Sequence, residues 1–260
     1  MFDEVYHYLA EKQQDSWIIK HRQKIIERIF NRFEIRGLKR CLDVGMGTGA
    51  NVEFLERFCS DVVGIEFSEL ALEYASKLFP QRKFIRGDAN NLRKTFKTSS
   101  FDLVTFFGVL CHKWIPDELE VLKQVNTILK PGGYIMLSEA AFNFLMRDSD
   151  VAGMTRRRYT KSDFKNWFEQ AGFEMVYNTY FNMLVFPAVL AIAMFDRFRN
   201  MLLQKKEVVP NSPVKIVEGI FWKLANDLMM GITGLERFLI RSFGGLPVGV
   251  SLICIGRKSD

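Results

Sequence analysis

The chain has 260 residues, of which 48% are hydrophobic and 25% charged; these proportions are typical of a single globular domain and exclude a disordered or collagen-like chain. The net charge of +6 favours anionic partners, but no nucleic-acid-binding motif accompanies it, so we expect no nucleic acid partner. The four cysteines lie far apart without a Cys-x-x-Cys pair, which predicts neither a metal site nor a disulfide framework and fits a reducing cytoplasm.

Residues 1–37 are predicted to form an N-terminal helical segment. The first ten residues have neither a basic start nor an apolar run, which argues against a secretory signal, and we expect a cytoplasmic protein. Isoleucines and phenylalanines then recur at helical spacing between residues 18 and 33, behind a capping residue at Asp15 or Ser16. This pattern predicts an amphipathic helix ahead of the first strand.

A Rossmann-like core is predicted for residues 38–181 and 248–260. Helical patterns alternate with strand patterns through most of this part of the chain. The strands are expected at residues 39–44, 62–66, 83–86, 101–107, 134–138, 173–181 and 248–256. Strands that alternate with helices pair in parallel through right-handed crossovers, so we expect an open, doubly wound α/β sheet within a single domain.

Residues 182–247 form a helical insertion before the last strand, because they are too many for a simple loop. Apolar clusters at residues 184–195 and 220–230 give it more apolar surface than a monomeric surface helix usually exposes. The insertion is expected to roof an acceptor pocket, with core completion and a homodimer interface as alternatives. Peripheral contact with the inner face of a membrane also stays open, favoured by the basic residues Arg197, Arg199, Lys205 and Lys206.

The chemistry is concentrated in the turn after the first strand, residues 43–49, which reads Asp-Val-Gly-Met-Gly-Thr-Gly. Glycines let the backbone adopt positive φ and approach a ligand, and the following helix start offers free N–H groups. The order differs from the Gly-x-Gly-x-x-Gly dinucleotide pattern, and Asp43 would repel a pyrophosphate. The turn therefore predicts a site for a cationic ligand; a purely structural turn is the alternative.

Two further carboxylates follow neighbouring strands. Glu66 ends the second strand, where a carboxylate accepts hydrogen bonds from both hydroxyls of a ribose. Asp88 follows the third strand in the sequence Gly-Asp-Ala, where a carboxylate can accept from an exocyclic adenine amine. Their coincidence with the glycine turn at matching strand ends predicts one nucleoside-binding site.

Residues 42–49, 87–89, 101–104 and 129–133, together with Glu66, resemble the successive motifs of class I S-adenosylmethionine-dependent methyltransferases of the small-molecule group. The resemblance implies a seven-stranded sheet in the order 3-2-1-4-5-7-6 with the last strand antiparallel. It implies S-adenosylmethionine as the cofactor and methyl transfer to a small-molecule, sugar or lipid-linked acceptor. A non-catalytic protein that binds this cofactor is the alternative; a nucleotide-dependent oxidoreductase is disfavoured by Asp43.

The resemblance also implies which residues contact the cofactor, and it implies no metal. The implied turn and cofactor contacts are Asp43, Gly45, Gly47, Gly49, Glu66 for the ribose, Phe67 beside the adenine ring, Asp88 for the adenine amine, Ala89 and Phe107. The sequence departs from the common pattern at Met46, where a small residue or Cys often stands, and at Cys111, where related enzymes often have Glu.

The acceptor side is less specific. His112 follows the fourth strand and is the candidate general base for a neutral hydroxyl acceptor, with helix capping or packing as the alternative. Glu139 is expected either near the acceptor or at the surface. His7 and His21 lie on a segment that could fold over the active site, and solvated helix histidines are the expected case. Residues 156–158 are three arginines that could bind an anionic acceptor or form a solvated basic turn. Residues 157–160, 171–173 and 180–182 resemble a bacterial subgroup associated with cell-surface glycan synthesis.

Overall fold

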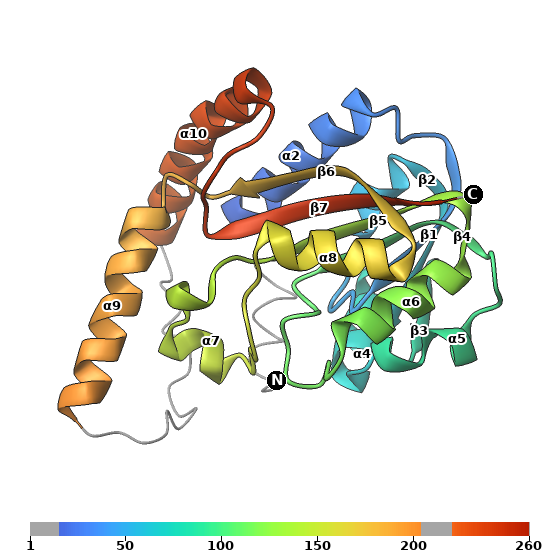
Figure 1. The fold of residues 1–260 in the computed structure, drawn as a ribbon, viewed down its shortest axis with the longest axis horizontal. Helices are drawn as coiled ribbons and strands as arrows, with labels where there is room; N and C mark the ends of the chain where they lie inside the picture. Colours follow the sequence, from blue (N-terminus) through green and yellow to red (C-terminus); the bar gives the residue numbers. More distant parts are fainter. Residues whose placement is uncertain (1–15, 204–219, 260) are drawn as a thin grey trace.

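The computed structural model describes residues 16–203 and 220–259, and these form one seven-stranded sheet flanked by helices on both faces (Figure 1). The strands are β1 (Leu38–Val44), β2 (Cys59–Glu66), β3 (Lys83–Arg86), β4 (Phe101–Phe107), β5 (Leu129–Ala140), β6 (Phe173–Phe181) and β7 (Ser251–Lys258). Their order is β3-β2-β1-β4-β5-β7-β6. Strands β1 to β5 pair in parallel and β7 runs antiparallel to both neighbours. The predicted fold is confirmed.

The helices cover the sheet in two layers. They are α2 (Trp17–Arg32), α3 (Val52–Glu56), α4 (Glu69–Leu78), α5 (Leu92–Thr95), α6 (Glu118–Ile128), α7 (Asp148–Ala152), α8 (Lys161–Ala171), α9 (Phe186–Leu202) and α10 (Ile220–Phe243), with short 3-10 turns at Ala89–Asn91 and Asn143–Leu145. Successive strand residues point to opposite faces: Leu42 packs with α6 and α8 in one core, and Cys41 packs with α2 and α3 in the other. The central strands are therefore buried on both sides.

Helix α2 buries its apolar stripe against the sheet. Ile25, Ile26, Ile29 and Phe30 are buried and recur at helical spacing, and the helix begins directly after Ser16, as predicted. His21 lies on the same face and is fully buried, so the expectation of a solvated side chain is wrong for it. His7 lies outside the described residues.

The helix after the glycine turn is shorter than predicted. Helix α3 spans only Val52–Glu56, and Phe58 is buried outside it. A helix dipole sums over aligned peptide units, so one helical turn contributes little to an anion or cation site. The binding properties of the turn therefore have to come from its own backbone and from the side chains around it.

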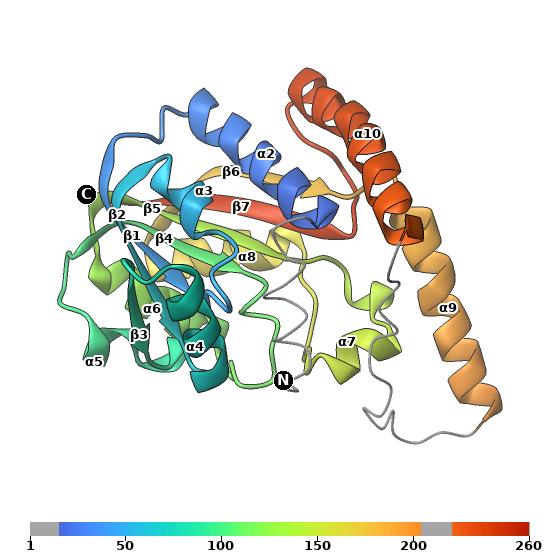
Figure 2. The same cartoon turned by 180° about the vertical axis from the view of Figure 1, so that it is seen from behind.

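The insertion before β7 consists of α9 and α10, which lie at one end of the molecule beyond the edge strand β6 (Figures 1 and 2). Helix α10 packs beside α2, whereas α9 contacts the 3-10 turn at Asn143–Leu145. Strand β7 starts at Ser251, three residues later than predicted. Ahead of it, the backbone of Leu246 bonds Thr179 and Tyr180 of β6. Within the described residues, no helix is both long and apolar enough to cross a bilayer.

Candidate active site

A cavity of about 450 Å³ lies at the carboxyl ends of the parallel strands, where open α/β sheets bind ligands. The structure brings most of the predicted site residues together there. Those that line the cavity are Gly45, Gly47, Glu66, Phe67, Asp88, Ala89, Phe107 and His112. Asp43 and Gly49 are not among the lining residues. The assignment of these residues to a cofactor stays a prediction, but their convergence on one cavity is a property of the fold.

The glycine turn is shaped by its backbone conformation. Gly45 and Gly47 have φ of +65° and +59°, in the left-handed region that favours glycine. A Cβ on Gly45 would lie 2.6 Å from the Val109 side chain, whereas at Gly47 no atom lies within 4 Å of that position. Gly45 is therefore required for packing, and Gly47 leaves an open face through which a ligand can approach the backbone.

Glu66 closes the turn with its side chain. Its Oε2 accepts the Gly47 backbone N–H at 2.9 Å, and its Oε1 accepts the Ser68 N–H at 2.9 Å. A carboxylate has about four acceptor positions, so each oxygen retains one for a ligand that enters the cavity. The same carboxylate can thus hold the turn and accept two hydroxyl groups.

Asp88 and Phe67 lie on the neighbouring wall. Asp88 Oδ1 accepts both the backbone and side-chain N–H groups of Asn90 at 2.8 Å, but Oδ2 has only a 3.4 Å contact with Asn91. Oδ2 is the oxygen left for an external donor. The Phe67 ring is 72% exposed although it lines the cavity, so it offers one open face to a planar group.

Asp43 lies beneath the turn rather than in the cavity. It is fully buried, and its Oδ1 accepts the Thr105 hydroxyl at 2.8 Å, while Oδ2 has no hydrogen-bond partner within the described chain. Burial raises the pKa of Asp43 to about 7, because a carboxylate loses hydration there. Asp43 is thus not among the residues that line the cavity, and its contact with a cationic ligand stays a prediction.

Arg22 is a site residue that sequence reasoning missed. It projects from α2 into the cavity, where Nη2 donates to Asn51 at 3.1 Å and the guanidinium lies 4.5 Å from the centre of the Phe107 ring. Burial lowers its pKa to about 10, while the charges of Asp43 and Glu139 oppose that shift. Arg22 therefore remains a cation at neutral pH and gives the cavity an anion-binding group.

Glu139 is buried, so its interpretation as a surface carboxylate is wrong. It lies within β5, and its Oε1 accepts the backbone N–H groups of Val109 and Leu110 at 2.9 and 3.1 Å. Its Oε2 has no partner among the described residues. Burial raises the pKa of Glu139 to about 7. This carboxyl fixes the loop after β4, which carries His112 into the cavity.

His112 stacks on Trp114, with ring centres 4.2 Å apart and planes inclined by 18°. It does not cap the following helix, because Asp117 fills that position and accepts the Glu120 N–H. Its Nδ1 is buried and has no hydrogen-bond partner in the described structure. Burial lowers the pKa of His112, so the imidazole is neutral at physiological pH and one ring nitrogen can accept a proton.

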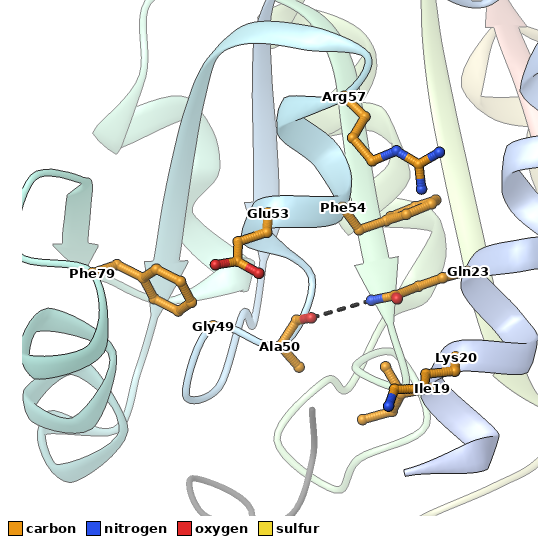
Figure 3. A pocket seen from close by; sticks show the side chains of 9 residues that line it. All are labelled: Ile19, Lys20, Gln23, Gly49, Ala50, Glu53, Phe54, Arg57 and Phe79. Carbon is orange, nitrogen blue, oxygen red and sulfur yellow. Dashed lines mark hydrogen bonds between the residues drawn. The ribbon is translucent and has the colours of Figure 1, made fainter. Parts of the chain in front are cut away.

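Gly49 faces a second, smaller cavity of about 230 Å³ on the other side of the turn (Figure 3). A Cβ at this position would lie 2.9 Å from the Phe79 ring, so close packing requires glycine here. On the opposite wall Gln23 Nε2 donates to the Ala50 carbonyl at 3.2 Å. This bond attaches α2, and with it Arg22, to the glycine turn.

The three arginines at residues 156–158 are all used in ion pairs. Arg156 lies 2.6 Å from Glu118, and Arg157 lies 3.2 Å from Asp163. Arg158 is buried and lies 2.8 Å from Asp150. None of the three lines the cavity. They hold the segment between α7 and α8 in place and are not a solvated basic turn.

The described residues contain no cluster of side chains that could hold a metal ion. None of the described residues of the insertion lines this cavity, and a role of the insertion in covering an acceptor pocket stays a prediction. Instead, α10 is tied to the core through Glu236, which lies 3.4 Å from His21 and accepts the backbone N–H groups of Asn182 and Met183.

Comparison with known proteins identifies the fold family. Residues 42–137 match the family model described as a methyltransferase domain. The demethylmenaquinone methyltransferase of Staphylococcus saprophyticus is 29% identical over 147 residues, which cover 54% of this chain and 58% of that protein. The chain spans about half the length of the curated relatives that it matches.

Two solved structures show the same fold at low sequence identity. A SAM-dependent methyltransferase from Archaeoglobus fulgidus superposes with a TM-score of 0.55 and 17% identity, covering 97% of this chain and 100% of that one. The cyclase SpnF superposes with a TM-score of 0.57 and 16% identity, covering 91% and 80%. Residues 42–137 therefore match a methyltransferase domain, and the strand order is that of the S-adenosylmethionine-dependent methyltransferase fold.

Proposed function

We propose that this chain binds S-adenosylmethionine in the 450 Å³ cavity and transfers its methyl group to a small-molecule acceptor. The observation that carries the proposal is the placement of Glu66 and Asp88 at neighbouring strand ends, each with acceptor capacity left over beside the open face of Gly47. This set of groups matches the ribose and the adenine of an adenosine-containing cofactor.

The remaining groups fit the amino-acid part of S-adenosylmethionine. Arg22 is the cation that lines the cavity, and it would bind the carboxylate through its forked donors. Asp43 is buried beneath the turn with an unpartnered oxygen, and with a pKa of about 7 it would carry a partial negative charge at neutral pH that suits an ammonium and a sulfonium. The negative charge of Asp43 would repel the pyrophosphate of a dinucleotide, which disfavours a nucleotide-dependent oxidoreductase.

When bound, the cofactor supplies an activated methyl group. The work of the chain is to align a nucleophile with that group and to exclude water, and alignment alone can account for several kcal/mol of a barrier. His112 lines the same cavity with a lowered pKa and would take the proton from a neutral acceptor. An acceptor that is already deprotonated needs no such base.

For the acceptor we favour a planar, quinone-like molecule. The relative from Staphylococcus saprophyticus is named for such a substrate, and the cavity presents the aromatic faces of Phe67, Phe107 and Trp114. A sugar or lipid-linked sugar finds no comparable support, because the three arginines at residues 156–158 are paired with carboxylates away from the cavity.

We further propose peripheral contact between the insertion and a membrane that carries such an acceptor. Seven large apolar residues of α9 and its C-terminal end are more than one third exposed: Ile192, Met194, Phe195, Phe198, Met201, Leu202 and Leu203. Exposed apolar surface of this extent marks an interaction site. The exposed Arg197 beside them favours an anionic bilayer over a second, equally cationic copy of the chain. Lys205 and Lys206 lie outside the described residues.

The acceptor is tested by incubating the protein with radiolabelled S-adenosylmethionine and fractionated cell extract. We expect the label in an apolar, organic-soluble fraction. Label in a water-soluble sugar fraction would exclude the quinone-like acceptor. Cofactor binding without transfer to any fraction would favour the non-catalytic alternative, since the fold by itself does not determine the activity.

A further inference from the structure

Residues of α2 and α10 line a groove of about 770 Å³. The two helices lie side by side (Figure 2). Four arginines line the groove: Arg28, Arg32, Arg237 and Arg241. It shares no lining residue with the cofactor cavity. We propose that this groove binds the phosphate headgroup of an anionic membrane lipid. The inference deepens the membrane contact proposed above and does not depend on methyl transfer.

The positive charge of the groove is only partly compensated, by the charge of Glu236 near Arg237. None of its four arginines forms a carboxylate ion pair within the described chain, whereas elsewhere Arg57, Arg82 and Arg93 pair with glutamates. The groove arginines instead use neutral partners: Arg28 donates to the Arg237 carbonyl at 3.1 Å, and Arg237 donates to Thr233 at 3.0 Å. Guanidinium groups gathered with little counter-charge favour an anion, and their planar forks match phosphate oxygens.

The like charges also act on one another. Burial and the nearby charge of Arg28 both lower the pKa of Arg237. An anion held between α2 and α10 would relieve this repulsion, because it would place an opposite charge close to each guanidinium. The groove is open to such a ligand, since Arg28, Arg32 and Arg241 are all exposed.

The groove also has an apolar part, beside the polar lining residues Asn31, Tyr177 and Ser242. Ile25, Ile29 and Ile240 are buried and form its floor, and Phe243, 75% exposed, lies between two residues of its rim. A free phosphate ion could bind the guanidinium groups, but the apolar surface would stay exposed to water. A lipid headgroup followed by its acyl chains satisfies both, because it joins an anionic group to hydrocarbon.

The groove can be tested by vesicle co-sedimentation with the full chain. We would compare phosphatidylcholine vesicles with vesicles of phosphatidylcholine and phosphatidylglycerol at 70:30, for the wild type and for Arg28→Gln/Arg241→Gln. The matched control, Arg86→Gln/Arg93→Gln, removes the same charge from two exposed arginines outside the groove. We expect the groove variant to lose about tenfold in affinity for the anionic vesicles, with the control unchanged and thermal unfolding alike in all three proteins.

Each other outcome has a separate meaning. An equal loss of affinity for anionic vesicles in both double variants would mean that only the net charge matters. That result would overturn the proposed headgroup site. Equal wild-type binding to both vesicle types would keep the membrane contact but overturn the headgroup site. A thermal shift with inorganic phosphate alone, without vesicle binding, would identify a soluble phosphate as the ligand and overturn the lipid. Methyl transfer measured on the same variants would report on the cofactor site independently.

Discussion

The carboxylate of Glu66 accepts the backbone N–H of Gly47 at 2.9 Å, across nineteen residues of sequence. This bond joins the end of β2 to the glycine turn after β1 and places both at one side of the cavity. The residue predicted to bind the ribose therefore also fixes the turn against which the ligand lies. Loss of this side chain should affect ligand binding and local structure together.

Replacing Glu66 with Gln should weaken binding of S-adenosylmethionine by about tenfold or more, since hydrogen bonds to a charged group contribute about 1.5 to 3 kcal/mol each. Titration calorimetry measures the change. Glu69→Gln, which alters an exposed carboxylate at the start of α4, is the control and should bind normally. Unchanged affinity in the Glu66 variant would remove this residue from the site.

The role of Arg22 can be distinguished from that of the nucleoside-binding groups by comparing the binding of two ligands. Arg22→Gln should weaken S-adenosylmethionine but leave 5′-methylthioadenosine, which lacks the amino-acid part, nearly unaffected. The physical reason is that the guanidinium is proposed to pair with a carboxylate that only the first ligand carries. Equal weakening of both ligands would instead mean that Arg22 acts on the turn through Asn51.

Asp43 should make stability depend on pH. Its pKa is raised from 3.8 to about 7 in the folded chain, so the native state binds the proton more tightly than the unfolded state. The stabilisation of the native state by this bound proton is fully present below pH 3.8 and is lost as the pH rises toward 7. In urea unfolding, the free energy of unfolding of Asp43→Asn relative to that of the wild type should therefore rise by about 2 kcal/mol between pH 5 and pH 7. Asp61→Asn, at an exposed ion pair, should show no such trend.

His112→Gln should lower turnover by about 100-fold while cofactor affinity is retained, if the imidazole takes a proton from the acceptor. The lowered pKa of His112 predicts a wild-type rate that is flat at pH 7 to 8 and falls only below pH 6.5. That falling limb should vanish in the variant. Turnover close to that of the wild type would assign His112 to packing against Trp114.

Phe195→Ser/Phe198→Ser should reduce binding to vesicles of every composition, because these side chains are 62% and 56% exposed and would leave water on contact. Leu78→Ser is the matched control, an exposed apolar residue on α4 at another part of the surface. If light scattering showed a dimer that the double variant dissociates, the face would be an interface between copies instead.

The sequence predicted those parts of the site that depend on local signals. The glycine turn, Glu66 and Asp88 all lie at strand ends, and parallel strands bring their carboxyl ends to one edge, so the strand pattern was enough to join them. The start of β7 was predicted three residues too early. Leu246 pairs with β6 ahead of this strand, and the local sequence pattern does not show such a tertiary contact.

The missed residues depend on contacts between distant segments. Arg22 looks like any polar residue of an amphipathic helix until α2 packs beside the turn, and Glu139 looks like the exposed end of a strand until the loop after β4 covers it. The burial of His21 follows from its contact with Glu236, 215 residues away. For Arg22 and Glu139 the local pattern does not carry this information, whereas His21 lies four residues before Ile25 on the same helical face, so the helical spacing could have indicated its burial.

The most direct measurement is a calorimetric titration of the full chain with S-adenosylmethionine, its demethylated product and NAD⁺. Binding of the first two at one shared site, abolished or strongly weakened in a Glu66→Gln/Asp88→Asn variant, and no binding of NAD⁺ is the result we predict. Binding of NAD⁺, or S-adenosylmethionine affinity that survives the loss of both carboxylates, would contradict the proposed site.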